Sequence, residues 1–261
     1  MRIAFVGKGG AGKTTLARAC VEFLIREGKT VCALDADLNQ HLAQQLGVEL
    51  RAEQAISTPE HMQEIRTYLR GTNPRIVGTE QMVKTTPPGT GSNLIRLLPE
   101  DAFIKRHARS PRERLFVVTV GTYEATDIGT SCYHTNLGIA ENMLSHVVDD
   151  NEHWLVADTV AGTDAFSGSL HLQFDVIFFV AEPTAESMGV WQQYRALAQV
   201  SGIEDHVRVL GNKIQDTEDE AYLKQEIGAV LIGCFSEDRR VKRARREGKE
   251  VSIGSVEQDA D

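Results

Sequence analysis

The residues from position 7 to position 15 are Gly7-Lys8-Gly9-Gly10-Ala11-Gly12-Lys13-Thr14-Thr15. An apolar run at 3–6 precedes them, and a helical pattern at 15–26 follows directly. A glycine-rich turn between a strand and a helix is the setting in which backbone N–H groups bind phosphate. Glycine allows such a turn because it carries no Cβ atom. This stretch, called the phosphate loop below, therefore predicts a site for a nucleoside triphosphate.

The side chains of the phosphate loop have distinct expected tasks. Lys13 supplies a positive charge to the β- and γ-phosphates, and the Thr14 hydroxyl is suited to Mg²⁺. The residues expected to contact the nucleotide here are Gly9, Gly10, Ala11, Gly12, Lys13, Thr14 and Thr15.

Length and composition set the frame for this site. The chain has 261 residues, of which 41% are hydrophobic and 25% charged, as expected for one large soluble domain. We expect no secretory leader, because a strand follows Met1 and Arg2 directly, and no membrane span, because no long apolar run exists. Four cysteines are too few for a disulfide framework and favour the cytoplasm. The net charge of −9 argues against general nucleic-acid binding.

The remaining chain alternates between short apolar runs and helical patterns. We expect strands at 3–6, 30–34, 94–98, 115–120, 153–158, 175–180, 207–210 and 229–233. We expect helices at 15–26, 39–46, 59–69, 136–148, 185–201, 218–227 and 238–247. Apolar strands separated by helices predict a single α/β domain, 1–261, with a doubly wound, mostly parallel sheet and helices on both faces. Residues 51–93 are polar and read as a loop-rich insertion, and 251–261 as an acidic tail.

Acidic residues and a glycine lie where predicted strands end. Asp35 and Asp37 follow the run at 30–34, and Asp158 ends the run at 153–158 in the form of a Walker B element. Because ligands of parallel sheets bind at the carboxyl ends of strands, we expect Asp158 to hold a water bound to Mg²⁺. Gly162 follows and can bend toward the γ-phosphate. The alternative for Asp35 and Asp37 is a pair of acids at a sheet rim.

A second lysine, Lys8, follows the first glycine of the phosphate loop. The run from Lys8 to Thr15 resembles the deviant Walker A ATPases of the ParA, MinD and nitrogenase iron-protein kind, which are P-loop NTPases of the SIMIBI type. The resemblance implies that the nucleotide is ATP or ADP, that the protein hydrolyses ATP slowly, and that it dimerises with nucleotide. In that family the extra lysine reaches the partner's nucleotide, while a lysine in a glycine-rich loop is otherwise simply solvated.

The same resemblance implies further roles. Asp37 would orient the water that attacks the γ-phosphate, Asp35 would support the magnesium shell, and Asn212 would bind the adenine. The implied catalytic residues are thus Lys8, Lys13 and Asp37. Leu38 departs from the family, which commonly has proline there, and an asparagine such as Asn212 is otherwise often a turn residue.

A more specific resemblance lies at Cys132-Tyr133-His134. Its position and the runs 35–42, 158–162 and 182–184 resemble the CooC-type ATPases, which help to insert nickel into carbon monoxide dehydrogenase. The resemblance implies a transition-metal site, Zn²⁺ or Ni²⁺, formed by Cys132 and His134 of two chains, and a client metalloenzyme as partner. The alternative is that Cys132 is a packing residue and His134 a loop or capping group. Cys20, Cys32 and Cys234 are expected to be core thiols.

The segment Arg239–Arg246 has six basic residues in eight, which suits a different function. Such a helix could bind DNA phosphates in a positioning ATPase of the ParA or MinD kind. The favoured alternative is a solvated helix whose cations lie near the negative end of its dipole. We expect no attachment to a membrane, because the tail 251–261 is acidic.

Overall fold

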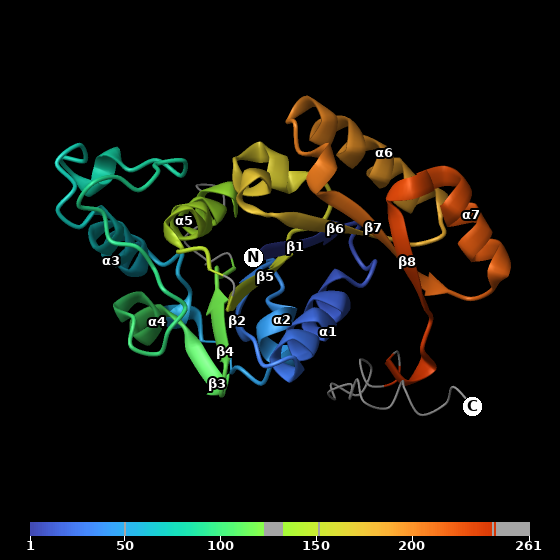
Figure 1. Cartoon of the computed structure of the whole chain (residues 1–261), viewed down its shortest axis with the longest axis horizontal. Helices are drawn as coiled ribbons and strands as arrows, with labels where there is room; N and C mark the ends of the chain where they lie inside the picture. Colours follow the sequence, from blue (N-terminus) through green and yellow to red (C-terminus); the bar gives the residue numbers. More distant parts are fainter. Residues whose placement is uncertain (50, 123–132, 151, 242, 244–261) are drawn as a thin grey trace.

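The computed structural model describes residues 1–49, 51–122, 133–150, 152–241 and 243. Within them, one sheet has eight strands in the order β3-β4-β2-β5-β1-β6-β7-β8 (Figure 1). The strands are β1 (Arg2–Gly7), β2 (Thr30–Ala36), β3 (Arg109–Arg112), β4 (Leu115–Thr119), β5 (His153–Thr159), β6 (Val176–Ala181), β7 (Val207–Ile214) and β8 (Leu231–Ser236). Neighbouring strands pair in parallel, except that β3 runs antiparallel to β4. The predicted doubly wound, mostly parallel sheet is confirmed.

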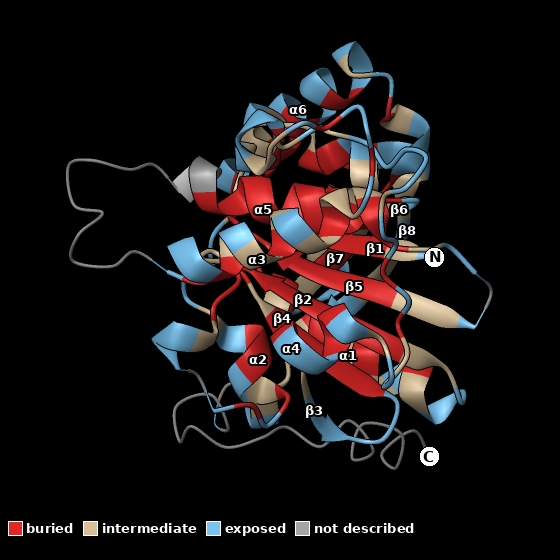
Figure 2. Ribbon diagram, turned by 90° about the vertical axis from the view of Figure 1, so that its left-hand side faces the viewer, coloured by how far each residue is buried: buried red, intermediate tan, exposed pale blue. Residues whose placement is uncertain are grey.

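Helices cover both faces of this sheet (Figures 1 and 2). They are α1 (Lys13–Arg26), α2 (His41–Gln45), α3 (Pro59–Arg70), α4 (Ala102–His107), α5 (Tyr133–His146), α6 (Ala185–Val200) and α7 (Thr217–Ile227). Short 3₁₀ turns lie at Ala52–Gln54, Thr79–Gln81, Asp164–Ser167, Leu170–Gln173, Glu204–His206 and Gly228–Val230. No helix of the described residues is both long enough and apolar enough to cross a bilayer.

The two faces form two buried apolar clusters, and β1 contributes to both. Ile3 and Phe5 pack with α1 and α2, whereas Ala4 and Val6 face the cluster that contains the other helices. A strand buried on both sides needs apolar residues at successive positions. This is why the strands were visible in the sequence as continuous apolar runs.

The prediction of a strand at 94–98 is wrong. Ile95 forms only an isolated parallel bridge with Val147, just after α5. The Ile95 N–H donates to the His146 carbonyl over 2.8 Å, and the Val148 N–H donates to the Ile95 carbonyl over 2.9 Å. Ile95 and Leu97 are buried, so the segment alternates like a strand. Its backbone partner, however, is the end of a helix, where a ladder cannot continue.

Three other elements differ from expectation, and one of them is α4, which the sequence did not predict. Strand β3, with the sequence Arg-Ser-Pro-Arg, has no apolar pattern and was missed; its proline fits because β3 is an edge strand. Strand β7 extends to Ile214, past the predicted end at 210, through polar residues. Most of the helix predicted at 238–247 lies outside the described residues.

The region 51–93 is connected to the sheet through β4. The Ile56 N–H donates to the carbonyl of Thr119, the last residue of β4, over 3.0 Å. Thr58 then caps the N-terminus of α3, where its hydroxyl accepts from the His61 N–H. Ile65 on α3 is fully buried in the same cluster as the strands. The apolar side chains of this region therefore share the core of the sheet.

Candidate functional site

The phosphate loop connects β1 to α1 at the carboxyl edge of the sheet. Gly7, Gly10 and Gly12 have φ angles of 133°, 84° and 104°, which side chains with a Cβ rarely adopt. A Cβ on Gly7 would also collide with the Val180 carbonyl oxygen of β6. The first α1 hydrogen bond runs from the Leu16 N–H to the Gly12 carbonyl, at 3.0 Å. The N–H groups at the start of α1 consequently point toward the loop without acceptors inside the helix.

The side chain of Lys13 folds back over this loop. Lys13 is only 6% exposed, and its Nζ lies 3.5 Å from the Lys8 carbonyl oxygen. The same oxygen accepts from the Ala11 N–H over 3.2 Å. Burial of an ammonium group is unfavourable unless it is compensated. A phosphate anion in the loop would supply that compensation.

Two buried carboxylates lie side by side beneath the loop, because Asp35 of β2 and Asp158 of β5 are register partners. The Thr14 hydroxyl donates to Oδ2 of Asp158 over 2.5 Å. Oδ2 of Asp35 accepts from the Ala43 N–H over 2.8 Å. Burial, with a further contribution from the charge of Asp158, raises the pKa of Asp35 to about 7.

These three side chains suit Mg²⁺, because they offer only oxygen atoms and two of them are carboxylates in a poorly solvated place. Thr14 and Asp158 would hold the ion, with Asp35 supporting its shell. A cation there would favour the ionised form of Asp35, against the effect of burial.

Asp37 lies just beyond β2 and is half-buried. Its Oδ1 accepts from both the backbone N–H and the side-chain amide of Asn39, each over 2.9 Å. Gly162 approaches the loop from the end of β5, where its N–H donates to the Gly7 carbonyl over 3.0 Å. The segment after β5 is thereby attached to the first residue of the phosphate loop.

The other side of the loop is contacted by β7. The Asn212 amide donates to the Ala11 carbonyl over 2.7 Å, and Lys213 Nζ donates to the Gly10 carbonyl over 2.8 Å. Lys213 also pairs with Glu182, whose second carboxylate oxygen lies 3.9 Å from Nζ of Lys8. Glu182 thus connects two lysines next to the loop.

Sequence reasoning did not identify Glu182 or Lys213 as site residues. The available signals were an acid directly after an apolar strand and a lysine directly after Asn212. Neither reveals that the two residues pair, because their contact depends on β6 and β7 being neighbours.

The predicted cysteine and histidine site is not described at atomic level. Cys132 lies outside the described residues, and His134 falls in the first turn of α5 with its side chain outside the description. Of the other thiols, Cys32 is buried, and Cys20 and Cys234 are half-buried. Burial raises the pKa of Cys20 to about 11 and that of Cys32 to about 12. These two thiols are therefore un-ionised at neutral pH, which fits packing residues.

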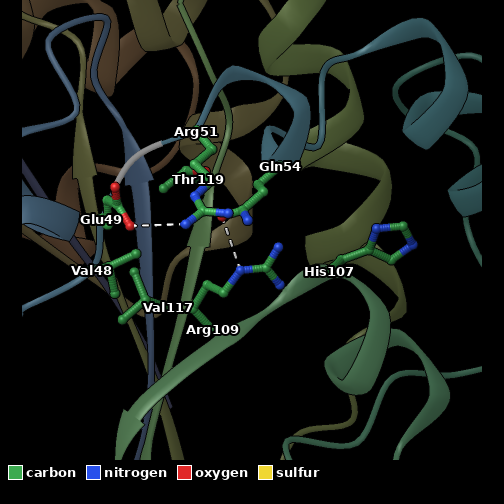
Figure 3. A pocket seen from close by; sticks show the side chains of 8 residues that line it. All are labelled: Val48, Glu49, Arg51, Gln54, His107, Arg109, Val117 and Thr119. Atoms are coloured by element: carbon green, nitrogen blue, oxygen red, sulfur yellow. Dashed lines mark hydrogen bonds and ion pairs between the residues drawn. The ribbon is translucent and has the colours of Figure 1, made fainter.

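A pocket lies away from the phosphate loop (Figure 3). Its lining residues are Val48, Glu49, Arg51, Gln54, His107, Arg109, Val117 and Thr119. Arg51 pairs with Glu49 at 3.1 Å, and Arg109 donates to Gln54 over 3.0 Å. The two arginines of the pocket are therefore already engaged.

The family of the chain follows from a sequence match over nearly its whole length. A family model described as the CobQ/CobB/MinD/ParA nucleotide binding domain matches residues 3–251. The chain belongs to this family. As a member of the CobQ/CobB/MinD/ParA family it is a nucleotide-binding ATPase.

Individual relatives support the same assignment. An ATP-binding protein of Methanocaldococcus jannaschii is 25% identical, covering 98% of this chain and 92% of its own. The carbon monoxide dehydrogenase accessory protein CooC of Rhodospirillum rubrum is 24% identical, covering 95% and 88%. Among solved structures, a ParA family ATPase from Chlorobium tepidum covers 99% and 93% with a TM-score of 0.67 at 14% identity. At this level of identity, the similarity to the ParA family ATPase shows only that the two proteins share a fold.

Proposed function

We propose that this ATPase works in the cytoplasm as a nucleotide-gated homodimer that assists maturation of a nickel or zinc cofactor in a client enzyme. Its likeness to the accessory protein CooC over 95% of the chain supports this proposal. So does the sequence pair Cys132-x-His134, which would offer a thiolate and an imidazole to a transition metal.

Hydrolysis in this proposal depends on positioning and charge neutralisation. Lys13 neutralises the β- and γ-phosphates, and Lys8 reaches the nucleotide of the partner subunit. Asp37 orients the attacking water, while Asn212 binds the adenine. Mg²⁺, held by Thr14 and Asp158, supplies charge neutralisation at the phosphates. Turnover is slow and serves as a switch between two dimer geometries.

The observation that carries the proposal is a contact between the segment after β5 and α5. Glu141 on α5 is 2% exposed, and its carboxylate accepts from both the N–H and the hydroxyl of Ser169. The segment that contains Ser169 follows β5 and passes through Gly162, whose N–H donates to the carbonyl of Gly7 in the phosphate loop. A rearrangement of this segment with nucleotide would be transmitted to α5, which has His134 in its first turn and follows Cys132 directly in the sequence.

The number of ligands supplies the argument for the dimer. One chain offers one thiolate and one imidazole, whereas a tetrahedral Zn²⁺ site takes four ligands. Two chains would complete a site with two cysteines and two histidines. Metal binding at Cys132 should therefore require the ATP-bound dimer.

The test measures metal content and mass of the purified protein with and without ATP, beside Cys132→Ala and, as a control thiol, Cys20→Ala. We expect ATP to add one Zn²⁺ or Ni²⁺ per dimer to the metal content of the nucleotide-free protein, and this addition should be lost in Cys132→Ala and kept in Cys20→Ala. A dimer that forms with ATP but binds no metal through Cys132 would refute the proposal. ATP-dependent DNA retention that is lost when 239–246 is neutralised would then favour a positioning ATPase.

A further inference from the structure

A second group of metal-binding side chains lies between α3 and α4, remote in sequence from the phosphate loop. His61 and Glu64 lie three residues apart on α3, and His107 is the last residue of α4. One ligand atom of each lies within 4.8 Å of the others. The two imidazole rings are 5.0 Å apart at an angle of 77°. Two imidazoles and one carboxylate therefore converge on one place.

His61 is already oriented as a ligand. Its Nδ1 lies 3.0 Å from the Ala55 carbonyl oxygen, and because a carbonyl only accepts, Nδ1 carries the hydrogen. Nε2 therefore keeps its lone pair. The adjacent Ile56 N–H is fixed to the end of β4 through the Thr119 carbonyl. A histidine whose second nitrogen donates to a backbone carbonyl is the usual arrangement around metal ions in proteins.

His107 supplies an independent observation. It is only 6% exposed, and its Nδ1 has no hydrogen-bond partner among the described residues. A buried polar nitrogen without a partner is costly and calls for an explanation. In Figure 3 His107 lies on the far side of Arg109 from Glu49.

Glu64 is held in place by Arg106. Nε and Nη2 of Arg106 donate to Oε2 and Oε1 of Glu64, each over 2.9 Å. A carboxylate oxygen has two lone pairs, so each oxygen can still accept a metal ion on its other side. Arg106 would then fix the carboxylate toward the two imidazoles, as outer partners of ligating carboxylates do.

We infer that His61, Glu64 and His107 form a site for a divalent transition-metal ion of the Zn²⁺ class, with water as the fourth ligand. Two imidazoles and one carboxylate are a known ligand set for such ions, whereas Mg²⁺ and Ca²⁺ prefer oxygen ligands. The ion would fasten α3 to α4. The site is complete within one chain, so it binds one ion per chain without ATP and without Cys132.

The test uses the full chain as Cys132→Ala, stripped of metal with a chelator, and titrates Zn²⁺ without nucleotide. We expect one Zn²⁺ per chain. Glu64→Gln should weaken binding by roughly tenfold or more, because it removes the ligating charge. Glu60→Gln is the matched control: Glu60 lies on the same helix, 3.7 Å from Arg106, but outside the cluster. The Zn²⁺ affinity of Glu60→Gln should stay within about twofold of that of Cys132→Ala alone.

Co²⁺ provides a second readout. Its absorption spectrum should show bands of nitrogen and oxygen ligands without a thiolate charge-transfer band, and Glu64→Gln should reduce them while Glu60→Gln should not. Equal Zn²⁺ affinity in Glu64→Gln and Glu60→Gln would overturn the inference, as would failure of Cys132→Ala to bind Zn²⁺. Metal that is lost only with Cys132 would support the proposed function and reject this site, so the two outcomes are separable.

Discussion

At the scale of single residues, positively and negatively charged side chains occupy different parts of the nucleotide site. The ammonium group of Lys13 lies over the phosphate loop, whereas the carboxylates of Asp35 and Asp158 lie at the strand ends beneath it. A phosphate with its magnesium ion brings the opposite charges to both places. Substitutions at these residues should therefore separate nucleotide binding from turnover.

Lys13→Ala should abolish nucleotide binding. It removes a buried positive charge that would neutralise the phosphates, a loss of about 2–5 kcal/mol or roughly thirtyfold and more in affinity. Calorimetric titration with ATP and Mg²⁺ measures the effect. Lys29→Ala, which changes a lysine paired at 3.9 Å with exposed Glu152, is the control and should bind normally. Micromolar ATP affinity in Lys13→Ala would contradict the role of Lys13.

Asp37→Ala should bind ATP normally and lose turnover. The carboxylate accepts from the N–H and the side-chain amide of Asn39, outside the phosphate loop, so its loss should not affect the phosphate contacts. Phosphate release under saturating ATP measures turnover, and Asp37→Asn keeps the shape while removing the charge. An unchanged rate in both variants would remove Asp37 from the catalytic role.

The raised pKa of Asp35 predicts a pH dependence of stability. The folded value is about 7 against an ordinary value of 3.8, so the folded protein binds more protons in this window. The stabilising contribution is complete below the lower value and is lost as pH rises through the higher one. Without nucleotide, Asp35→Asn should gain stability relative to wild type by a few kcal/mol between about pH 4 and pH 8. Urea unfolding at several pH values tests this, and a constant difference would refute it.

At the scale of elements, the phosphate loop depends on how closely β1 approaches β6. Gly7 pairs with Val180 in the sheet register and leaves no room for a Cβ beside the Val180 carbonyl. The loop therefore begins at a position that only glycine can occupy.

Gly7→Ala should cost roughly 3 kcal/mol or more in unfolding free energy, because strain and collision add. The control is Gly28→Ala, at a φ of +76° but with no atom within 4 Å of the added Cβ. It should cost only about 1–2 kcal/mol, from strain alone. Chemical denaturation measures both variants. Equal losses of unfolding free energy in the two variants would show that β6 shifts to accommodate the added Cβ, and they would contradict the prediction.

At the scale of the whole molecule, the position of Lys8 bears on assembly. Its Nζ lies 3.9 Å from Glu182 of the same chain, and its side chain is about one-third exposed. Glu182 also pairs with Lys213, so it keeps a cationic partner if Lys8 leaves it for the nucleotide of a partner subunit.

Lys8→Ala should bind ATP but lose the ATP-dependent dimer, with at least about a tenfold weaker association. Light scattering over a concentration series with a non-hydrolysable ATP analogue measures this. Lys29→Ala is a close control, because Lys29 has a similar exposure and a pair of the same 3.9 Å length. If Lys8→Ala dimerises at the same protein concentration as the wild type, Lys8 does not bind the nucleotide of the partner subunit as predicted.

The sequence by itself determined the phosphate loop, most strands and the fold class. Phosphate binding needs a few consecutive residues between a strand and a helix, so its signal is local. Strands buried on both faces are recognisable as apolar runs for a similar reason. The same rule produced the error at 94–98, where Ile95 and Leu97 are buried against the core without a neighbouring strand.

Only the tertiary structure decided which distant side chains meet. Asp35 lies beside Asp158 because β2 and β5 are neighbours, and Glu182 reaches Lys213 because β6 and β7 are. His61 and His107 converge because α3 and α4 pack together, although a long stretch of chain separates them. Such contacts depend on strand order and helix packing, which fix distances between segments that no local pattern relates.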